Sequence, residues 1–122
     1  MVVDRLGHLT VTEKRALSDF CARLRDKHPE KILDVLLFGS KARGDFDAES
    51  DLDLLILVAE EESQLTRDVV GIGSEIDLWY GVVLSEMTMS KARFEWHRRH
   101  RAPFYRNLTR ESISIWTNTA EF

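Results

Sequence analysis

The sequence predicts a mixed α/β domain of the α+β type, with a short mixed sheet and helices packed mainly on one side. Two apolar segments, 32–38 and 52–58, have the length and the aliphatic content of buried strands. A helical stripe at 65–79 lies between the second strand and an alternating segment at 82–88. The expected order is helix, strand, turn with a short helix, strand, helix, strand, helix and a short final strand. We expect residues 1–122 to form one domain with a modest core.

The first helix is expected to begin near Thr10 to Thr12, because Thr10 and Glu13 have the spacing of a capping box. Apolar residues then recur at helical intervals. They are Leu17, Phe20, Cys21 and Leu24. Cys21 is the single cysteine, so it forms no internal disulfide, and we expect a buried thiol rather than a reactive one.

A tight turn is expected after the first strand, at Gly39 and Ser40. Gly39 can adopt a positive φ or let the backbone approach a ligand, and Ser40 suits the N-cap of a short helix. Such a helix start attracts phosphate because its first N–H groups are free. Arg43 is the preferred candidate for a phosphate contact, since a guanidinium binds phosphate in bidentate fashion, and Lys41 is either a second contact or a solvated side chain.

Two aspartates, Asp51 and Asp53, open the second strand. Alternate residues of a strand share a face, so we expect both carboxylates on one face, about 6.5 to 7 Å apart along the chain, with Leu52 and Leu54 toward the core. Mg²⁺ prefers oxygen ligands, and two ions about 3.5 to 4 Å apart can clamp the oxygens of a phosphoryl transfer. A D-x-D pair alone is structural more often than catalytic. Its occurrence after a strand, a Gly-Ser turn and a polar loop favours a metal site.

Residues 39–56, G-S-K-A-R-G-D-F-D-A-E-S-D-L-D-L-L-I, resemble the signature of the DNA-polymerase-beta-like nucleotidyltransferase superfamily in its small stand-alone form, the minimal nucleotidyltransferases. Residues 102–116, A-P-F-Y-R-N-L-T-R-E-S-I-S-I-W, are similar to the closing helix and strand of that family, although Ser112 stands where Gly usually follows the Glu. The resemblance implies a nucleotidyltransferase fold. It also implies that Gly39 and Ser40 bind the phosphates of a nucleotide and that the two aspartates ligate the metal.

The superfamily implies a third carboxylate, for which two candidates stay open. The helical stripe places Asp77 on a helix. Its apolar members are Leu65, Val69, Ile72, Ile76 and Trp79. The segment 82–88 alternates as a strand that would bring Glu86 beside the aspartates, and we prefer Glu86 for this reason. If residues 74–80 form the strand instead, Asp77 takes the role. The remaining options are that the third acid is absent, or that either residue is an ordinary surface acid.

The resemblance further implies a metal-dependent enzyme that moves a nucleoside monophosphate, AMP from ATP or its equivalent from another nucleoside triphosphate, to a hydroxyl, with two Mg²⁺ ions. Minimal nucleotidyltransferases often act as antitoxins that adenylylate a tyrosine of a HEPN-type ribonuclease toxin, so we expect a partner chain of this type to supply the acceptor. Two alternatives stay open. They are a non-catalytic antitoxin or binding module on the same fold, and small-molecule modification of the aminoglycoside type.

The formal net charge of −4 argues against a general nucleic-acid binder. The segment 91–110 is strongly basic with interleaved aromatic residues, and three interpretations stay open: a solvated helix face, steering of a triphosphate, or contact with RNA or an acidic protein. His97 and His100 lack the accompanying Cys or acid cluster of a zinc site. The sequence has no apolar run long enough to cross a membrane and no readable secretory signal, so we expect a cytoplasmic protein.

Overall fold

The computed structural model describes residues 7–44 and 51–116. Within them the helices and strands follow one another as α1 (Val11–Lys27), β1 (Ile32–Phe38), α2 (Ser40–Arg43), β2 (Leu52–Val58), α3 (Ser63–Tyr80), β3 (Leu84–Ser90), α4 (Lys91–Arg99), α5 (Pro103–Glu111) and β4 (Ile113–Ser114). This order matches the expected one except between β3 and β4, where two helices replace the single helix that the sequence predicts. Arg101 lies between the two helices and adopts a positive φ of 49°, which interrupts the helical backbone.

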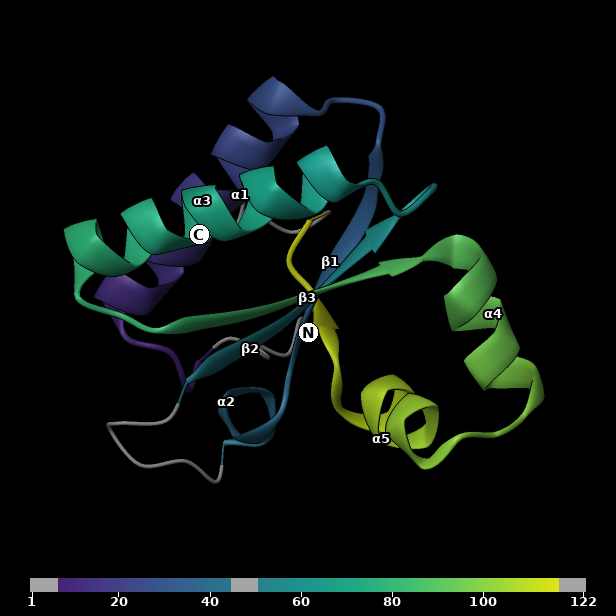
Figure 1. Ribbon diagram of the computed structural model, residues 1–122. Helices are drawn as coiled ribbons and strands as arrows, with labels where there is room; N and C mark the ends of the chain where they lie inside the picture. The colour runs from purple at the N-terminus through teal and green to yellow at the C-terminus, as the bar shows by residue number, and fades with distance from the viewer. Residues whose placement is uncertain (1–6, 45–50, 117–122) are drawn as a thin grey trace.

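The sheet is mixed, and its strands lie in the order β3-β2-β1-β4 (Figure 1). β1 pairs antiparallel with β2 and β4, whereas β2 and β3 run parallel, with α3 connecting them. The predicted fold class is therefore confirmed. Two register pairs matter for the site: Phe38 of β1 lies opposite Asp53, and Leu54 of β2 lies opposite Glu86.

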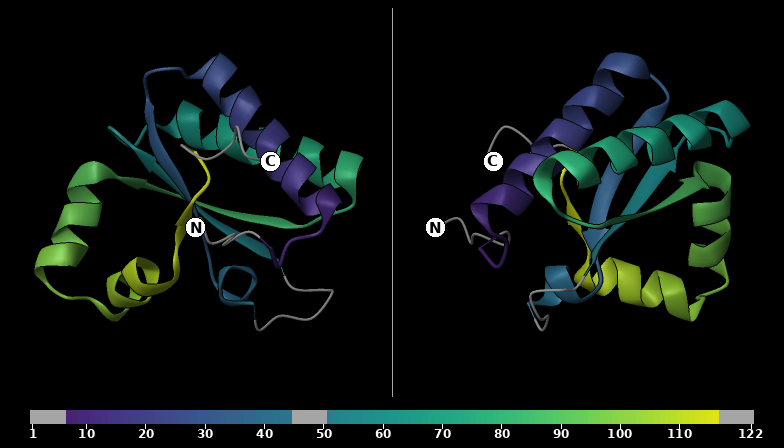
Figure 2. Two further views of the ribbon diagram at one scale, coloured as in Figure 1. Left: turned by 180° about the vertical axis from the view of Figure 1, so that it is seen from behind. Right: turned by 60° about the vertical axis from the view of Figure 1, so that its left-hand side comes forward.

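One face of the sheet is covered by the two long helices, α1 and α3, which pack against each other (Figures 1 and 2). Leu52, Leu54 and Ile56 of β2 point into this layer and are fully or almost fully buried. Because side chains alternate along a strand, the residues between them turn to the opposite face. β2 therefore supplies the main core from one face and carries Asp53 on the other.

The opposite face is partly covered by α4 and α5. Leu108 of α5 packs with Leu55 and Met89 of the sheet, and Phe94 and Phe104 join this smaller cluster. The helices thus lie mainly on one side, as expected, and the two short helices add a second, smaller layer. Phe94 and Phe104 of the basic segment are packing residues in this layer, whereas Trp96 and the arginines of the segment are exposed. This arrangement favours the solvated helix face among the three interpretations of the segment.

Several local predictions are confirmed at α1. The Oγ1 of Thr10 accepts a hydrogen bond from Glu13 N at 3.0 Å, and Oε1 of Glu13 accepts one from Thr10 N at 2.9 Å, which completes the capping box. Cys21 is fully buried, and this burial raises the pKa of its thiol to about 12. The thiol is therefore a packing group rather than a reactive one.

The predicted apolar stripe of α3 is buried as expected, except for its last residue. Trp79 is 79% exposed, whereas the other four residues of the stripe are buried. A stripe of seven-residue repeats drifts by about 20° per repeat on a straight helix, so its last member turns away from the core. Tyr80 takes the inward position instead, and its hydroxyl donates to Asp19 of α1 at 2.8 Å.

Within the described residues, no helix combines the length and the apolar character needed to cross a bilayer.

Candidate active site

The turn after β1 lies against the start of β2, because the two strands are antiparallel neighbours. Gly39 adopts a φ of +75°, and its carbonyl accepts hydrogen bonds from Ala42 N and Arg43 N, both at 3.1 Å. A Cβ at Gly39 would overlap the carboxylate of Asp53. The position therefore requires glycine for two reasons, the positive φ and the close approach of the carboxylate.

The two aspartates interact with each other at this turn. Asp51 is exposed just before β2, and Asp53 is half-buried on the face that carries α4 and α5. Burial and the charge of Asp51 raise the pKa of Asp53, and the charge of Arg43 lowers it in part. Bringing a divalent cation to the pair would relieve this repulsion. Because Mg²⁺ is often held by one or two carboxylates together with substrate phosphates, the donor set fits it.

The two cations of α2 have different surroundings. The Nζ of Lys41 lies 2.7 Å from Oε2 of Glu13, and its side chain is 3% exposed. The Nη1 of Arg43 lies 3.0 Å from Oε2 of Glu111, and its side chain is 41% exposed. Lys41 is therefore neither solvated nor directed at a ligand, whereas Arg43 stands at the surface beside the aspartates. Ser40 opens α2, and its side chain lies outside the described part of the chain.

Glu86 is not beside the aspartates. Neighbouring residues in parallel register share a face, and Glu86 lies opposite Leu54 rather than opposite Asp53. Its carboxylate sits under α3, where a Cβ at Gly73 would overlap it. Burial raises the pKa of Glu86, and the charge of Asp77 adds to this. The expectation that β3 would bring Glu86 beside the aspartates is therefore wrong. Alternation shows which residues of β3 share a face, but the register between β2 and β3 decides which of these faces lies beside Asp53.

The positions of β3 that do face the aspartate side hold no acid. Ser85 lies opposite Asp53, and Val83 and Met87 flank it along the same face. In the described parts of the chain, no three His, Cys, Asp or Glu side chains gather into a metal-binding cluster. β3 therefore adds no third carboxylate to the face of the sheet that carries Asp53.

Asp77 lies on α3, as the helical stripe predicts. Its Oδ1 accepts a hydrogen bond from Leu84 N at 2.9 Å, at the start of β3. Burial raises the pKa of Asp77, and the charge of Asp51 raises it further. Of the two candidates for the third acid, Asp77 is the one whose pKa is affected by the charge of Asp51.

Two glutamates that hold α2 in place were missed by the sequence reasoning. Glu13 pairs with Lys41 from α1, and Glu111 pairs with Arg43 from the end of α5. Glu13 already had a local role as the capping-box glutamate, and Glu111 belongs to the closing motif. Ser112 follows it with a φ of −73° and donates its N–H to Leu108 O, so glycine is not required there.

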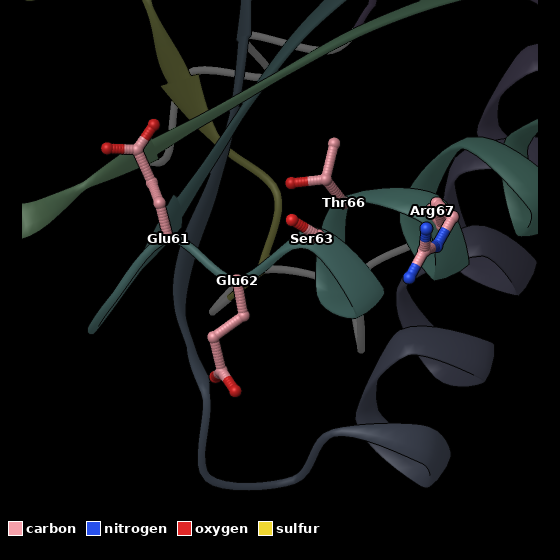
Figure 3. Close-up of a pocket in the computed structure, with 5 residues that line it drawn as sticks. All are labelled: Glu61, Glu62, Ser63, Thr66 and Arg67. Carbon is pink, nitrogen blue, oxygen red and sulfur yellow. The ribbon is translucent and has the colours of Figure 1, made fainter.

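A hollow of about 330 Å³ lies at the other end of β2, and Figure 3 shows the residues that line it. Its side chains come from the loop after β2 and from the first turn of α3, and they include Glu61, Glu62 and Arg67. Because the aspartates stand at the first residues of β2 and this hollow follows its last, the hollow is not part of the aspartate site.

Residues 17–111 match the family model described as the nucleotidyltransferase domain. The chain belongs to the nucleotidyltransferase domain family. Two proteins of Methanocaldococcus jannaschii are similar to it, each described as a "putative protein adenylyltransferase". One is 33% identical over 106 residues, which cover 87% of this chain and 100% of the relative. The other is 41% identical over 63 residues, which cover 51% of this chain and 64% of the relative.

A solved structure described as a "putative minimal nucleotidyltransferase" is 28% identical to the chain and superposes with a TM-score of 0.50. The superposed part covers 82% of this chain and 86% of the chain in the solved structure. The family match and this structural neighbour confirm the resemblance drawn from residues 39–56. The protein is a nucleotidyltransferase, an enzyme whose substrate is a nucleoside triphosphate.

Proposed function

We propose that the protein transfers AMP from Mg²⁺-bound ATP to a hydroxyl on a partner protein. The observation that carries the proposal is the position of the Asp53 carboxylate, which lies directly against the Gly39 turn and is influenced by the charge of Asp51. A carboxylate pair beside a backbone turn matches the needs of nucleotidyl transfer, where cation ligands and phosphate ligands must adjoin.

In this proposal Asp51 and Asp53 hold magnesium, and Gly39, Ser40 and Arg43 hold the phosphates. Bound magnesium would supply positive charge to the phosphate oxygens as charge builds up during transfer. The acceptor oxygen forms a bond to the α-phosphorus, the bond from that phosphorus to the bridging oxygen breaks, and pyrophosphate leaves. We assign the third acid to Asp77 in place of Glu86. Its raised pKa suits a general base that takes the proton of the acceptor hydroxyl.

We propose that the acceptor is a tyrosine of a HEPN-type toxin and that the protein is its antitoxin. Support comes from the description of the two archaeal relatives as protein adenylyltransferases and from the resemblance to minimal nucleotidyltransferases. The surface beside the aspartates also suits a protein acceptor, since Val83 is 55% exposed and Met87 43% exposed on that side of β3. The competing functions are contact-only neutralisation and small-molecule modification.

Intact-mass spectrometry of a HEPN-type partner mixed with the protein, ATP and Mg²⁺ tests the proposal. We expect a gain of one or more AMP units on the partner. The gain should disappear in Asp51→Asn and in Asp53→Asn. A stable complex with no mass gain from any of the four nucleoside triphosphates would overturn the enzymatic account in favour of contact alone.

Glu86→Gln is the matched control for these variants, because Glu86 is an acid on the adjacent strand that faces the other way. We expect it to retain the mass gain. Asp77→Asn keeps an oxygen to accept the Leu84 N–H, so a loss of activity without a loss of stability would support the third-acid role. The assignment to Asp77 fails if Glu86→Gln is inactive and Asp77→Asn is active.

A further inference from the structure

A cavity of about 270 Å³ lies between the end of β1 and α5, beside the Gly39 turn. Its apolar walls are formed by Phe38, Phe104 and Leu108. The rings of Phe38 and Phe104 meet edge to face, with centroids 5.9 Å apart. Pockets for whole drug-sized ligands measure roughly 300 to 1,000 Å³, so this cavity suits a single planar ring system rather than a large ligand.

The cavity adjoins the aspartate site. Gly39 and Arg43 line it, and Gly39 also lies against the carboxylate of Asp53. Phe38, in its wall, is the register partner of Asp53. Gly39 therefore borders both the cavity and the Asp53 carboxylate, so a ligand whose phosphates lie at the Gly39 turn has the cavity next to it for an attached ring.

The rim carries the polar groups that a heterocycle needs. Asn107 is exposed on α5, and its side-chain amide makes no hydrogen bond to any residue that the structure describes. Glu111 also lines the cavity and accepts from Arg43. An asparagine amide offers one acceptor and two donors, which is the complement of the amino group and the adjacent ring nitrogen of adenine. On the same edge, which carries N7, guanine presents two acceptors, O6 and N7, so an amide that pairs with both N6 and N7 of adenine cannot pair in the same way with guanine.

We infer that this cavity is the adenine subsite of the enzyme and that Asn107 determines its preference for ATP. The inference rests on the proposed function, because it takes the phosphates to lie at the Gly39 turn. The purine ring packs against Phe104, and the Asn107 amide pairs with N6 and N7 of adenine.

Calorimetric binding of ATP, GTP and inorganic triphosphate, each with Mg²⁺, tests the inference in the wild type and in Asn107→Leu. We expect the wild type to bind ATP more tightly than GTP. Asn107→Leu should weaken ATP binding about tenfold, as expected for a lost bidentate contact to a base, and should leave triphosphate binding unchanged. Thr109→Val is the control, since it removes a polar group from the same helix at a position that does not line the cavity.

The outcomes separate the two proposals. If triphosphate and ATP bind but Asn107→Leu leaves the ratio of ATP to GTP affinity unchanged, the adenine subsite is overturned while the proposed function stands. If ATP binds no more tightly than triphosphate, the subsite is overturned in the same way. If none of the three probes binds the wild type, the proposed function fails and the subsite fails with it.

Discussion

Lys41 and Arg43 lie two residues apart on the single-turn helix α2, yet they have opposite environments. The Lys41 side chain is 3% exposed and pairs with Glu13 of α1, whose side chain is 10% exposed. The Arg43 side chain is 41% exposed and pairs with Glu111 at the end of α5. Breaking a buried pair leaves an uncompensated charge inside the protein, whereas an exposed pair contributes little to stability.

The difference teaches that a run of basic residues after a Gly-Ser turn does not act as one phosphate-binding group. Lys41 fixes the turn to the first helix, and Arg43 remains at the surface where a phosphate can reach it. Stability should therefore depend on Lys41 and activity on Arg43.

The largest expected effect is on stability, in Lys41→Met. Glu13 would keep its buried charge and lose its cation, so we expect the free energy of unfolding to fall by about 3 kcal/mol or more. Arg43→Met should lower it by less than about 1 kcal/mol. Urea unfolding at neutral pH measures both. Equal losses in the two variants would contradict the division between the cations.

A smaller loss of stability is expected in Gly39→Ala, which alters the turn that precedes Lys41 and Arg43. The positive φ of +75° strains any residue with a Cβ, at roughly 1 to 3 kcal/mol, and the added Cβ would displace the Asp53 carboxylate. Stability and adenylylation should both fall. Gly71→Ala on α3 is the control, because a Cβ there meets nothing within 4 Å and alanine favours a helix. A neutral Gly39→Ala would show that the turn tolerates a side chain.

Arg43→Lys keeps the charge and removes the forked guanidinium, so it tests function rather than fold. If Arg43 binds phosphate in bidentate fashion, kcat/KM for ATP should fall about tenfold while the urea midpoint stays unchanged. Steady-state adenylylation rates and urea unfolding together check this. Unchanged kinetics would assign Arg43 to its contact with Glu111 alone.

The smallest effect is on the pH dependence of stability. Burial of Glu13 favours its neutral form, but hydrogen bonds from Lys41 and Thr10 outweigh this and lower its pKa below the ordinary value of 4.5. A lowered carboxyl pKa stabilises the fold above the unfolded value, and this stability is lost as pH falls through the folded value. The stability advantage of the wild type over Glu13→Gln should therefore shrink as pH falls below 4.5.

In the absence of metal, the contribution of Asp53 to stability should change with pH in the opposite direction to that of Glu13. Burial and Asp51 raise its pKa above 3.8, so its ionisation destabilises the fold as pH rises through the shifted value. Asp53→Asn should be more stable than the wild type at neutral pH, and the difference should vanish in acid. Urea midpoints of the wild type, Glu13→Gln and Asp53→Asn across the acid range measure both effects. If the stability difference from the wild type changed with pH in the same direction for both variants, these pKa directions would be contradicted.

Much of the fold was predictable because its signals are local. The capping box of Thr10 and Glu13 fixes the start of α1 within four residues of chain, and the stripe of α3 follows from helical geometry. The break at Arg101 also has a local signal, which the single predicted helix overlooked: Pro103 stands two residues further on, as the first residue of α5. The packing of Phe94 and Phe104 into the second layer depends on how two short helices fold back onto the sheet.

The sequence by itself determined that Leu52 and Leu54 face the core and that Asp53 faces away, since alternation along one strand needs no partner. Only the tertiary structure decided the side of the sheet on which Glu86 lies, because that depends on the register between β2 and β3. It likewise decided the partners of Lys41 and Arg43, which come from helices at the two ends of the described chain. Contacts within a few residues are set by backbone geometry, whereas contacts between distant segments are set by the packing of the whole domain.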